Sequence, residues 1–104
     1  MENMNSEEFL KRFEEIQKRS FELVKIKNNG YGSSFVTDSY EGVIVRLTDK
    51  LNRLRTLSSG NEQKIKTEGM LDTLMDLHNY SIIAMICLEN NIHSPLFKNN
   101  KKEK

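Results

Sequence analysis

The chain has 104 residues, enough for one domain with a modest core. Hydrophobic residues make up 37% of it and charged residues 30%, a balance that suits a globular helical protein and excludes a disordered one. The 16 basic and 15 acidic residues leave a net charge of +1, so no bulk field draws the chain to nucleic acid or to a membrane.

The distribution of apolar residues indicates a soluble, cytoplasmic protein. Residues 1–9 are acidic and polar and do not have the pattern of a signal peptide. The longest apolar stretch, Ile82–Leu88, is far shorter than the roughly 20 residues that a membrane span requires. Cys87 is the only cysteine and lies within this stretch, which points to a reducing compartment and to a buried, unreactive side chain.

The first predicted helix covers about residues 6–27. Asn5 is placed to cap it, with Glu8 three residues further on and Met4 able to pack on Phe9 as a hydrophobic staple. Apolar residues at steps of four and three predict one buried face, which consists of Phe9, Phe13, Ile16, Ser20 and Leu23.

A break over residues 28–35 separates the first helix from the second. It contains two glycines and two asparagines but lacks the Gly-Lys-Ser/Thr ending of a phosphate-binding P-loop. The second helix is predicted from Asp38, a good cap with Glu41 at the third position, to Leu57. Its apolar stripe consists of Tyr40, Ile44, Leu47, Leu51 and Leu54. A polar stripe on the same helix consists of Gly42, Arg46, Asp49 and Arg53.

The third and longest helix is predicted over residues 62–90, after a turn at 58–61. One face of it is apolar and consists of Leu71, Leu74, Leu77, Ser81, Met85 and Leu88. A different face is polar and contains Glu68, Asp72, Asp76 and Asn79. Beyond Tyr80 the helix is apolar almost all round, which is typical of a helix buried on every side. Because two neighbouring helices hardly cover it, we expect a homo-oligomer through residues 80–92.

The end of the chain is predicted to be a basic, disordered tail over residues 93–104, which leaves one domain over residues 1–92. The tail has a run of lysines but no arginine and no aromatic ladder, which argues against nucleic acid as a partner. His93 lies in this tail and is assigned no role. His78, on the apolar side of the third helix, is expected to be a packed or interface histidine.

Two polar stripes face each other if the second and third helices pair antiparallel across their short turn. Mg²⁺ prefers carboxylate oxygens, often one or two from the protein together with phosphate oxygens, and basic side chains can neutralise the remaining phosphate charge. Asp72 and Asp76 repel each other one helical turn apart when no cation is present. Asn79 and Tyr80 continue the polar line into the most apolar part of the chain, where a polar group needs a partner. Such stripes also form ordinary surface salt bridges, and that alternative stays open.

Three pieces of the sequence, in order, resemble the first of the nucleotide-modification-associated domain families of phages and bacteria. The pieces are Tyr31-Gly32-Ser33-Ser34-Phe35, then Gly42…Arg46-Leu47…Asp49-Lys50-Leu51…Arg53-Leu54, then Glu68…Asp72-Thr73-Leu74…Asp76-Leu77…Asn79-Tyr80. That family is in turn similar to the all-α nucleoside triphosphate pyrophosphohydrolases of the MazG-like group. The resemblance covers about residues 30–90 and implies an all-α, MazG-like domain with three main helices. It also implies that the domain binds or acts on nucleotides in the cytoplasm of a bacterium, or of the host if a phage encodes it.

The carboxylates of this chain differ from the MazG-like pattern, in which Glu-x-x-Glu and Glu-x-x-Asp on two helices hold Mg²⁺. The second helix has Asp49, with Glu41 two turns earlier, and is richer in basic residues. The first hypothesis is a Mg²⁺-dependent nucleotide pyrophosphohydrolase-like protein. Its expected metal ligands are Asp49, Glu68, Asp72 and Asp76, the last two also orienting a water for catalysis. Its expected substrate-binding residues are Tyr31, Phe35, Arg46, Lys50, Arg53, Asn79 and Tyr80. The alternatives are a non-catalytic sponge that sequesters a signalling nucleotide, and a helical interaction protein.

Overall fold

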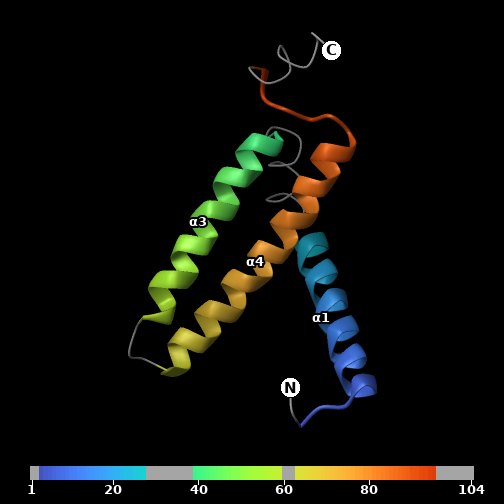
Figure 1. Cartoon of the computed structure of the whole chain (residues 1–104), viewed down its shortest axis with the longest axis vertical. Coiled ribbons are helices and arrows are strands. Elements are labelled where there is room, and N and C mark those ends of the chain that lie inside the picture. Colours follow the sequence, from blue (N-terminus) through green and yellow to red (C-terminus); the bar gives the residue numbers. More distant parts are fainter. Residues whose placement is uncertain (1–2, 28–38, 60–62, 96–104) are drawn as a thin grey trace.

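The computed structural model describes residues 3–27, 39–59 and 63–95, without the side chains of 63–66. This part of the chain is all-helical, with three helices and no strand (Figure 1). The helices are α1 over Ser6–Ile26, α3 over Tyr40–Ser58 and α4 over Gln63–Glu89. The all-α class is therefore confirmed, and each predicted helix end is right to within two residues. None of the three described helices has the length and apolar character that crossing a bilayer requires.

Local hydrogen bonds at the caps set where the helices begin. Asn5 caps α1 as predicted, since its Oδ1 accepts a hydrogen bond from the Glu8 backbone N–H at 2.8 Å. α3 begins two residues later than predicted, because its N-cap is Ser39, whose Oγ accepts from the Gly42 N–H at 3.3 Å. A side-chain oxygen at this position satisfies one of the backbone N–H groups that a helix start leaves unpaired. The cap predicted at Asp38 lies outside the described residues.

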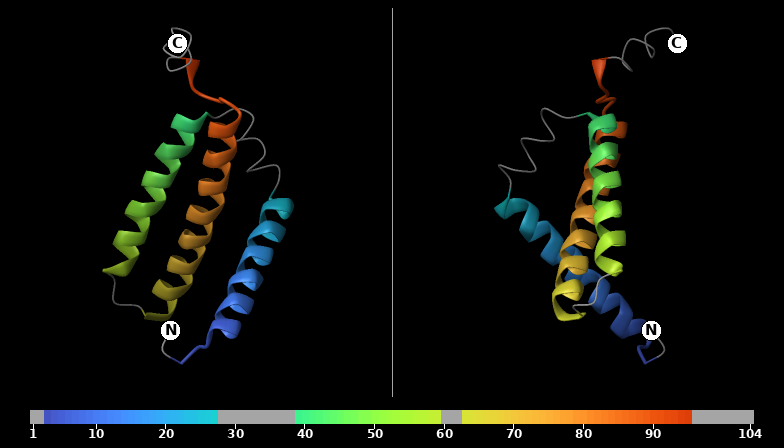
Figure 2. Two further views of the ribbon diagram at one scale, coloured as in Figure 1. Left: turned by 45° about the vertical axis from the view of Figure 1, so that its right-hand side comes forward. Right: turned by 90° about the vertical axis from the view of Figure 1, so that its left-hand side faces the viewer.

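α3 and α4 form an antiparallel pair, and α1 packs on the other side of α4 at a wider angle (Figures 1 and 2). The core lies mainly between α3 and α4, where the buried apolar side chains of the described residues are Val43, Ile83, Ala84 and Cys87. Cys87, the single cysteine of the sequence, is fully buried, as predicted. Partly buried apolar side chains from all three helices and from the segment after α4 surround this cluster: Val24, Tyr40, Leu47, Tyr80 and Ile92.

The buried face of α3 differs from the predicted stripe. Val43 is fully buried, whereas Ile44 and Leu51 of the predicted stripe are exposed. Tyr40 and Leu47 do pack against the core, so the prediction is right for part of the helix. The face shifts because Val43 and Lys50, each four or three residues from Leu47, turn toward α4 in place of their apolar neighbours.

The predicted apolar faces of α4 and α1 are only partly covered within one chain. The side of α4 that packs against α3 carries Thr73, Ile83, Ala84 and Cys87, so the predicted face is turned outward, and Leu71, Leu74, Met85 and Leu88 are exposed. Within the single chain the helix beyond Tyr80 is not buried on every side, because Ile82 and Ile86 are exposed as well, and its burial in a homo-oligomer stays a prediction.

α1 touches α4 through its carboxyl-terminal half. Ser20 is buried there, and its Oγ donates to Ile16 O at 2.8 Å and lies 2.7 Å from Met75 Sδ of α4. Toward its start, α1 diverges from α4 (Figure 1). For that reason Phe9, Phe13 and Ile16, which were expected to be buried, are exposed.

Candidate functional site

An ion pair joins the polar side of α3 to the polar stripe of α4. Lys50 Nζ lies 3.0 Å from Asp76 Oδ2, and the two side chains are 32% and 25% exposed. Lys50 reaches α4 because it follows Val43 and Leu47 at helical spacing and so lies at the edge of the face that packs. The antiparallel pairing thus brings Lys50, a predicted substrate-binding residue beside the polar stripe of α3, to Asp76 of the polar stripe of α4.

A second contact fixes the register between the two helices. Leu57 packs against Gly69, where an added Cβ would lie 3.2 Å from Leu57 Cδ1. Lys50 lies seven residues before Leu57 and Asp76 lies seven residues after Gly69, so both contacts belong to one antiparallel register.

The same register places the two arginines of the α3 stripe. Arg53 lies level with Thr73, and Arg46 lies level with Tyr80. Both arginines are exposed and lie one turn to either side of Lys50. One edge of the seam between α3 and α4 therefore carries three cationic side chains over about two helical turns.

The predicted metal ligands do not converge. Asp72 and Glu68 are exposed on α4, one and two turns before Asp76, which Lys50 engages. Asp49 is exposed on α3 and, as the neighbour of Lys50 in sequence, lies about 100° round the helix from it. Among the residues that the structure describes, no group of three acidic, histidine or cysteine side chains could hold a metal ion. The four residues therefore do not fit a preformed metal centre.

Asn79 has an unpaired hydrogen-bond donor in a buried position. Its side chain is only 2% exposed, and its Oδ1 lies 3.0 Å from His78 Nδ1. Because an amide oxygen can only accept, His78 Nδ1 carries the hydrogen and the Asn79 Nδ2 donors remain. Nδ2 has no hydrogen-bond partner among the described residues. A buried donor left unpaired costs about 1–3 kcal/mol, so this position is a candidate for contact with a ligand.

The remaining predicted substrate-binding residues divide into two groups. Tyr80 is half-buried and packs against the core beside Asn79. Tyr31 and Phe35, predicted to stack on a base, lie outside the described residues.

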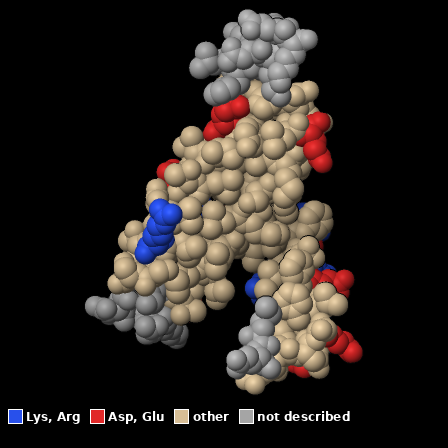
Figure 3. All heavy atoms as spheres, in the orientation of Figure 1, with Lys and Arg blue, Asp and Glu red and all other residues tan. Residues whose placement is uncertain are grey.

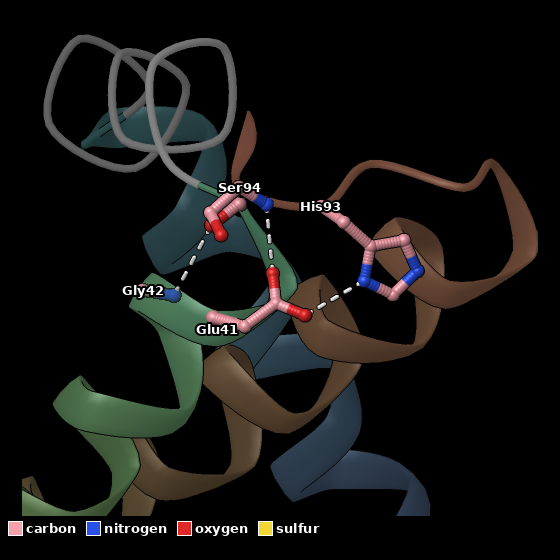
Figure 4. A network of polar contacts seen from close by, with 5 residues as sticks. Glu41, Gly42, His93 and Ser94 are labelled. Atoms are coloured by element: carbon pink, nitrogen blue, oxygen red, sulfur yellow. Dashed lines mark hydrogen bonds and ion pairs between the residues drawn. The ribbon is translucent and has the colours of Figure 1, made fainter. Parts of the chain in front are cut away.

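Sequence reasoning missed a polar clamp at the other end of the helix pair, where Glu41 joins the segment after α4 to the start of α3 (Figure 4). His93 Nδ1 lies 2.8 Å from Glu41 Oε2, and the Ser94 N–H donates to Glu41 Oε1 at 2.8 Å. The Tyr40 N–H donates to Ile92 O at 2.8 Å beside them. His93, placed by prediction in a disordered tail, is buried with 8% exposure. The two contacts join residues that are separated by 52 and 53 positions in the sequence, so no local sequence pattern predicts them.

The electrostatics of Glu41 follow from this clamp. Burial raises the pKa of its carboxyl, but the hydrogen bonds from His93 and from the Ser94 backbone lower it, and the net pKa lies below the ordinary value. The segment after α4 can reach Glu41 because Asn91 adopts a left-handed φ of 56°, which turns the backbone back toward the start of α3. The clamp therefore holds an ionised carboxylate at the start of α3 and closes the open end of the helix pair.

The fold and the seam define a small all-α domain with an antiparallel helix pair and a mixed basic and acidic edge. A model of the family described as nucleotide modification associated domain 1 matches residues 27–88, which is more than half of the chain. The chain belongs to this family, as its sequence motifs indicate. No curated protein and no solved structure matches it significantly. The matched range includes the whole seam and ends before His93.

Proposed function

We propose that the protein binds a nucleotide along the α3–α4 seam. The observation that carries the proposal is the line of Arg46, Lys50 and Arg53, which ends level with the unpaired buried amide of Asn79. Basic side chains one turn apart suit the consecutive phosphates of a nucleotide, to which they donate charge-assisted hydrogen bonds. Membership of a nucleotide-modification-associated family agrees with this proposal.

Each residue has a separate role in this proposal. Arg46 and Arg53 contact phosphate oxygens. Lys50 gives up part of its contact with Asp76 and binds a further phosphate oxygen. The Asn79 Nδ2 group donates to a carbonyl oxygen of the base or to a phosphate oxygen, which gives the buried donor the partner it lacks. Tyr31, Phe35 and Tyr80 stack on or flank the base.

A second candidate is Mg²⁺-dependent hydrolysis of a nucleoside triphosphate, as in the MazG-like enzymes. The observation in its favour is Asp72, exposed one turn from Asp76 at the same seam. Mg²⁺ bound to a polyphosphate requires only one or two protein carboxylates, so it can arrive with the nucleotide. Asp49 and Glu68 are the further ligands that the sequence predicts. Binding without turnover requires only the basic edge of the seam, so it is our first candidate and hydrolysis the second.

The proposal extends to the state of the protein in the cell. We expect a homo-oligomer in a phage-infected or uninfected bacterial cytoplasm, with the exposed apolar residues of 80–92 in its interface: Ile82, Met85, Ile86 and Leu88.

A sponge that sequesters a signalling nucleotide needs binding alone, which the basic edge can supply.

The test is calorimetric titration and thermal shift with nucleoside triphosphates, modified deoxynucleotides and cyclic dinucleotides. At 100 times its dissociation constant a ligand adds about 2.7 kcal/mol to stability. Lys50→Ala should weaken binding at least about tenfold, since a charge-assisted hydrogen bond contributes roughly 1.5–3 kcal/mol. Lys18→Ala, which removes the same charge from an exposed position on α1, is the matched control and should leave binding unchanged. If no nucleotide binds, the proposal is wrong and a helical interaction protein remains.

A second measurement separates the two candidates. Binding that survives excess chelator, with the ligand recovered intact, identifies a sponge. Release of pyrophosphate that requires Mg²⁺ and disappears in Asp72→Asn, while binding persists, identifies hydrolysis.

A further inference from the structure

We propose that two copies of the chain pair through the outer face of α4, antiparallel, about a two-fold axis that passes between His78 and Ser81. The inference specifies the interface of the oligomer suggested above and does not depend on nucleotide binding.

The outer face of α4 has the spacing of a coiled-coil seam. Six residues recur at steps of three and four through two and a half heptads, and we call them the α4 stripe: Leu71, Leu74, His78, Ser81, Met85 and Leu88. The four apolar members are 48–59% exposed, because α3 packs on the opposite side of the helix around Thr73 and Cys87. A stripe with this period and this exposure matches a second helix rather than solvent.

The stripe is complementary to itself when it runs antiparallel. Placing Leu74 opposite Met85 of the second copy also places Leu71 opposite Leu88. Apolar side chains then meet at both ends of the seam. The same register places His78 opposite Ser81, so that the two polar members meet at the centre. A two-fold interface requires this self-complementarity, because the same patch serves both copies.

The polar centre favours one register over the others. A shift of the second copy by one heptad places His78 or Ser81 against a leucine or methionine, so that a polar group is buried beside an apolar one. Single polar residues in coiled-coil seams fix register and orientation for this reason. The distribution of charge agrees, since residues 77–88 of α4 include no Asp, Glu, Lys or Arg, and the middle of the face seen in Figure 3 shows neither acidic nor basic side chains.

The exposed apolar area is large enough for a stable dimer. Exposed large apolar side chains also flank the stripe on α4 at Ile82 and Ile86, and they line the diverging half of α1 at Phe9, Phe13 and Ile16. If each half-exposed side chain offers roughly 80 Å², the side chains of both helices together offer about 700 Å², so an interface near the standard size of roughly 800 Å² per partner requires the start of α1 as well as the α4 stripe.

The test is disulfide cross-linking between full-length single-cysteine variants. Cys87→Ala removes the native thiol and keeps a small apolar side chain in the core. In this background, Leu74→Cys and Met85→Cys are oxidised alone and as a mixture. Only the mixture should give a covalent dimer, because facing Cα atoms lie within the roughly 4.4–6.8 Å that a disulfide spans. Two copies of position 74 would lie about 16 Å apart along the seam. Thr48→Cys, exposed on α3, mixed with Met85→Cys is the matched control and should stay unlinked.

Light scattering completes the test. The wild type should have the mass of a dimer. Met85→Glu should have the mass of a monomer and keep its helicity. Val45→Glu, which changes an exposed apolar site on α3, should keep the mass of a dimer. A monomeric wild type overturns both this inference and the oligomer in the proposed function. A dimer in which Leu74→Cys links to itself, or in which the mixture forms no link, overturns the antiparallel seam alone.

Discussion

Replacing Glu41 by alanine should destabilise the protein more than any comparable change at its surface. The substitution removes the acceptor of two hydrogen bonds of 2.8 Å, from His93 Nδ1 and from the Ser94 N–H. The His93 side chain is 7% exposed, so water replaces the lost carboxylate poorly, whereas Glu41 itself is 24% exposed and partly hydrated. A buried donor without an acceptor costs about 1–3 kcal/mol, and we expect a total loss of about 2 kcal/mol. In a domain of this size that lowers the melting temperature by roughly 8–16 °C.

The assay is unfolding by heat and by urea, followed by circular dichroism at one protein concentration, because association makes the melting temperature depend on concentration. Glu7→Ala is the matched control: it also removes a carboxylate from the first turn of a helix, but at an exposed position. It should cost only the interaction with the helix dipole, about 0.3–1 kcal/mol. If Glu41→Ala costs no more than Glu7→Ala, the clamp does not stabilise the fold and our reasoning is wrong.

The lowered pKa of Glu41 also predicts how the stability that this residue contributes changes with pH. The pKa of Glu41 is lowered in the folded chain, so its ionised form is favoured by folding. The stability it contributes is complete above the pKa of the unfolded carboxyl and is lost as the pH falls through the folded pKa. The gap in stability between wild type and Glu41→Gln should therefore be constant above about pH 6 and narrow steadily below about pH 4.5. A gap that widens on acidification would contradict the assignment.

Three further predictions concern single side chains of the helix pair. Gly69→Ala should raise stability by up to about 1 kcal/mol in urea unfolding, because the gain in helix propensity exceeds the small movement asked of Leu57; a loss would show that Leu57 cannot move. Asn79→Leu should leave stability unchanged or raise it by about 1 kcal/mol, since it removes an unpaired buried donor, yet it should abolish the thermal shift caused by nucleotides. Lys50→Met should cost less than about 1 kcal/mol in the same unfolding assay, because its ion pair with Asp76 is partly hydrated; a larger cost would assign the pair to the fold rather than to a ligand.

The helices could be predicted because their signals are local. The Asn5 cap and the spacing of apolar residues lie within a few positions of the helix that they define. The antiparallel pairing of α3 with α4 also follows from a local feature, the short turn between them. These two inferences were sufficient to bring Lys50 and Asp76 to the same seam.

The choice of buried face could not be predicted, because it depends on what packs against each helix. Within Ile82–Leu88 every side of α4 is apolar, so periodicity cannot select Ile83 and Cys87 over Ile82 and Met85. The clamp was missed for a related reason. Glu41 also has the position of a capping residue, which is a sufficient explanation of a glutamate there until the fold brings His93 to it.

The two proposals meet at adjacent residues of α4. His78 belongs to the stripe assigned to the second copy, while its Nδ1 holds the oxygen of Asn79, the residue assigned to the ligand. Pairing of two copies restricts the His78 ring and thereby fixes which way the Asn79 amide donates. Met85→Glu should therefore weaken nucleotide binding although Met85 contacts no part of the α3–α4 seam, whereas Lys50→Ala should weaken binding and leave the dimer intact. If Met85→Glu separates the copies and binding is unchanged, the interface and the ligand site are independent, and Asn79 is oriented within one chain.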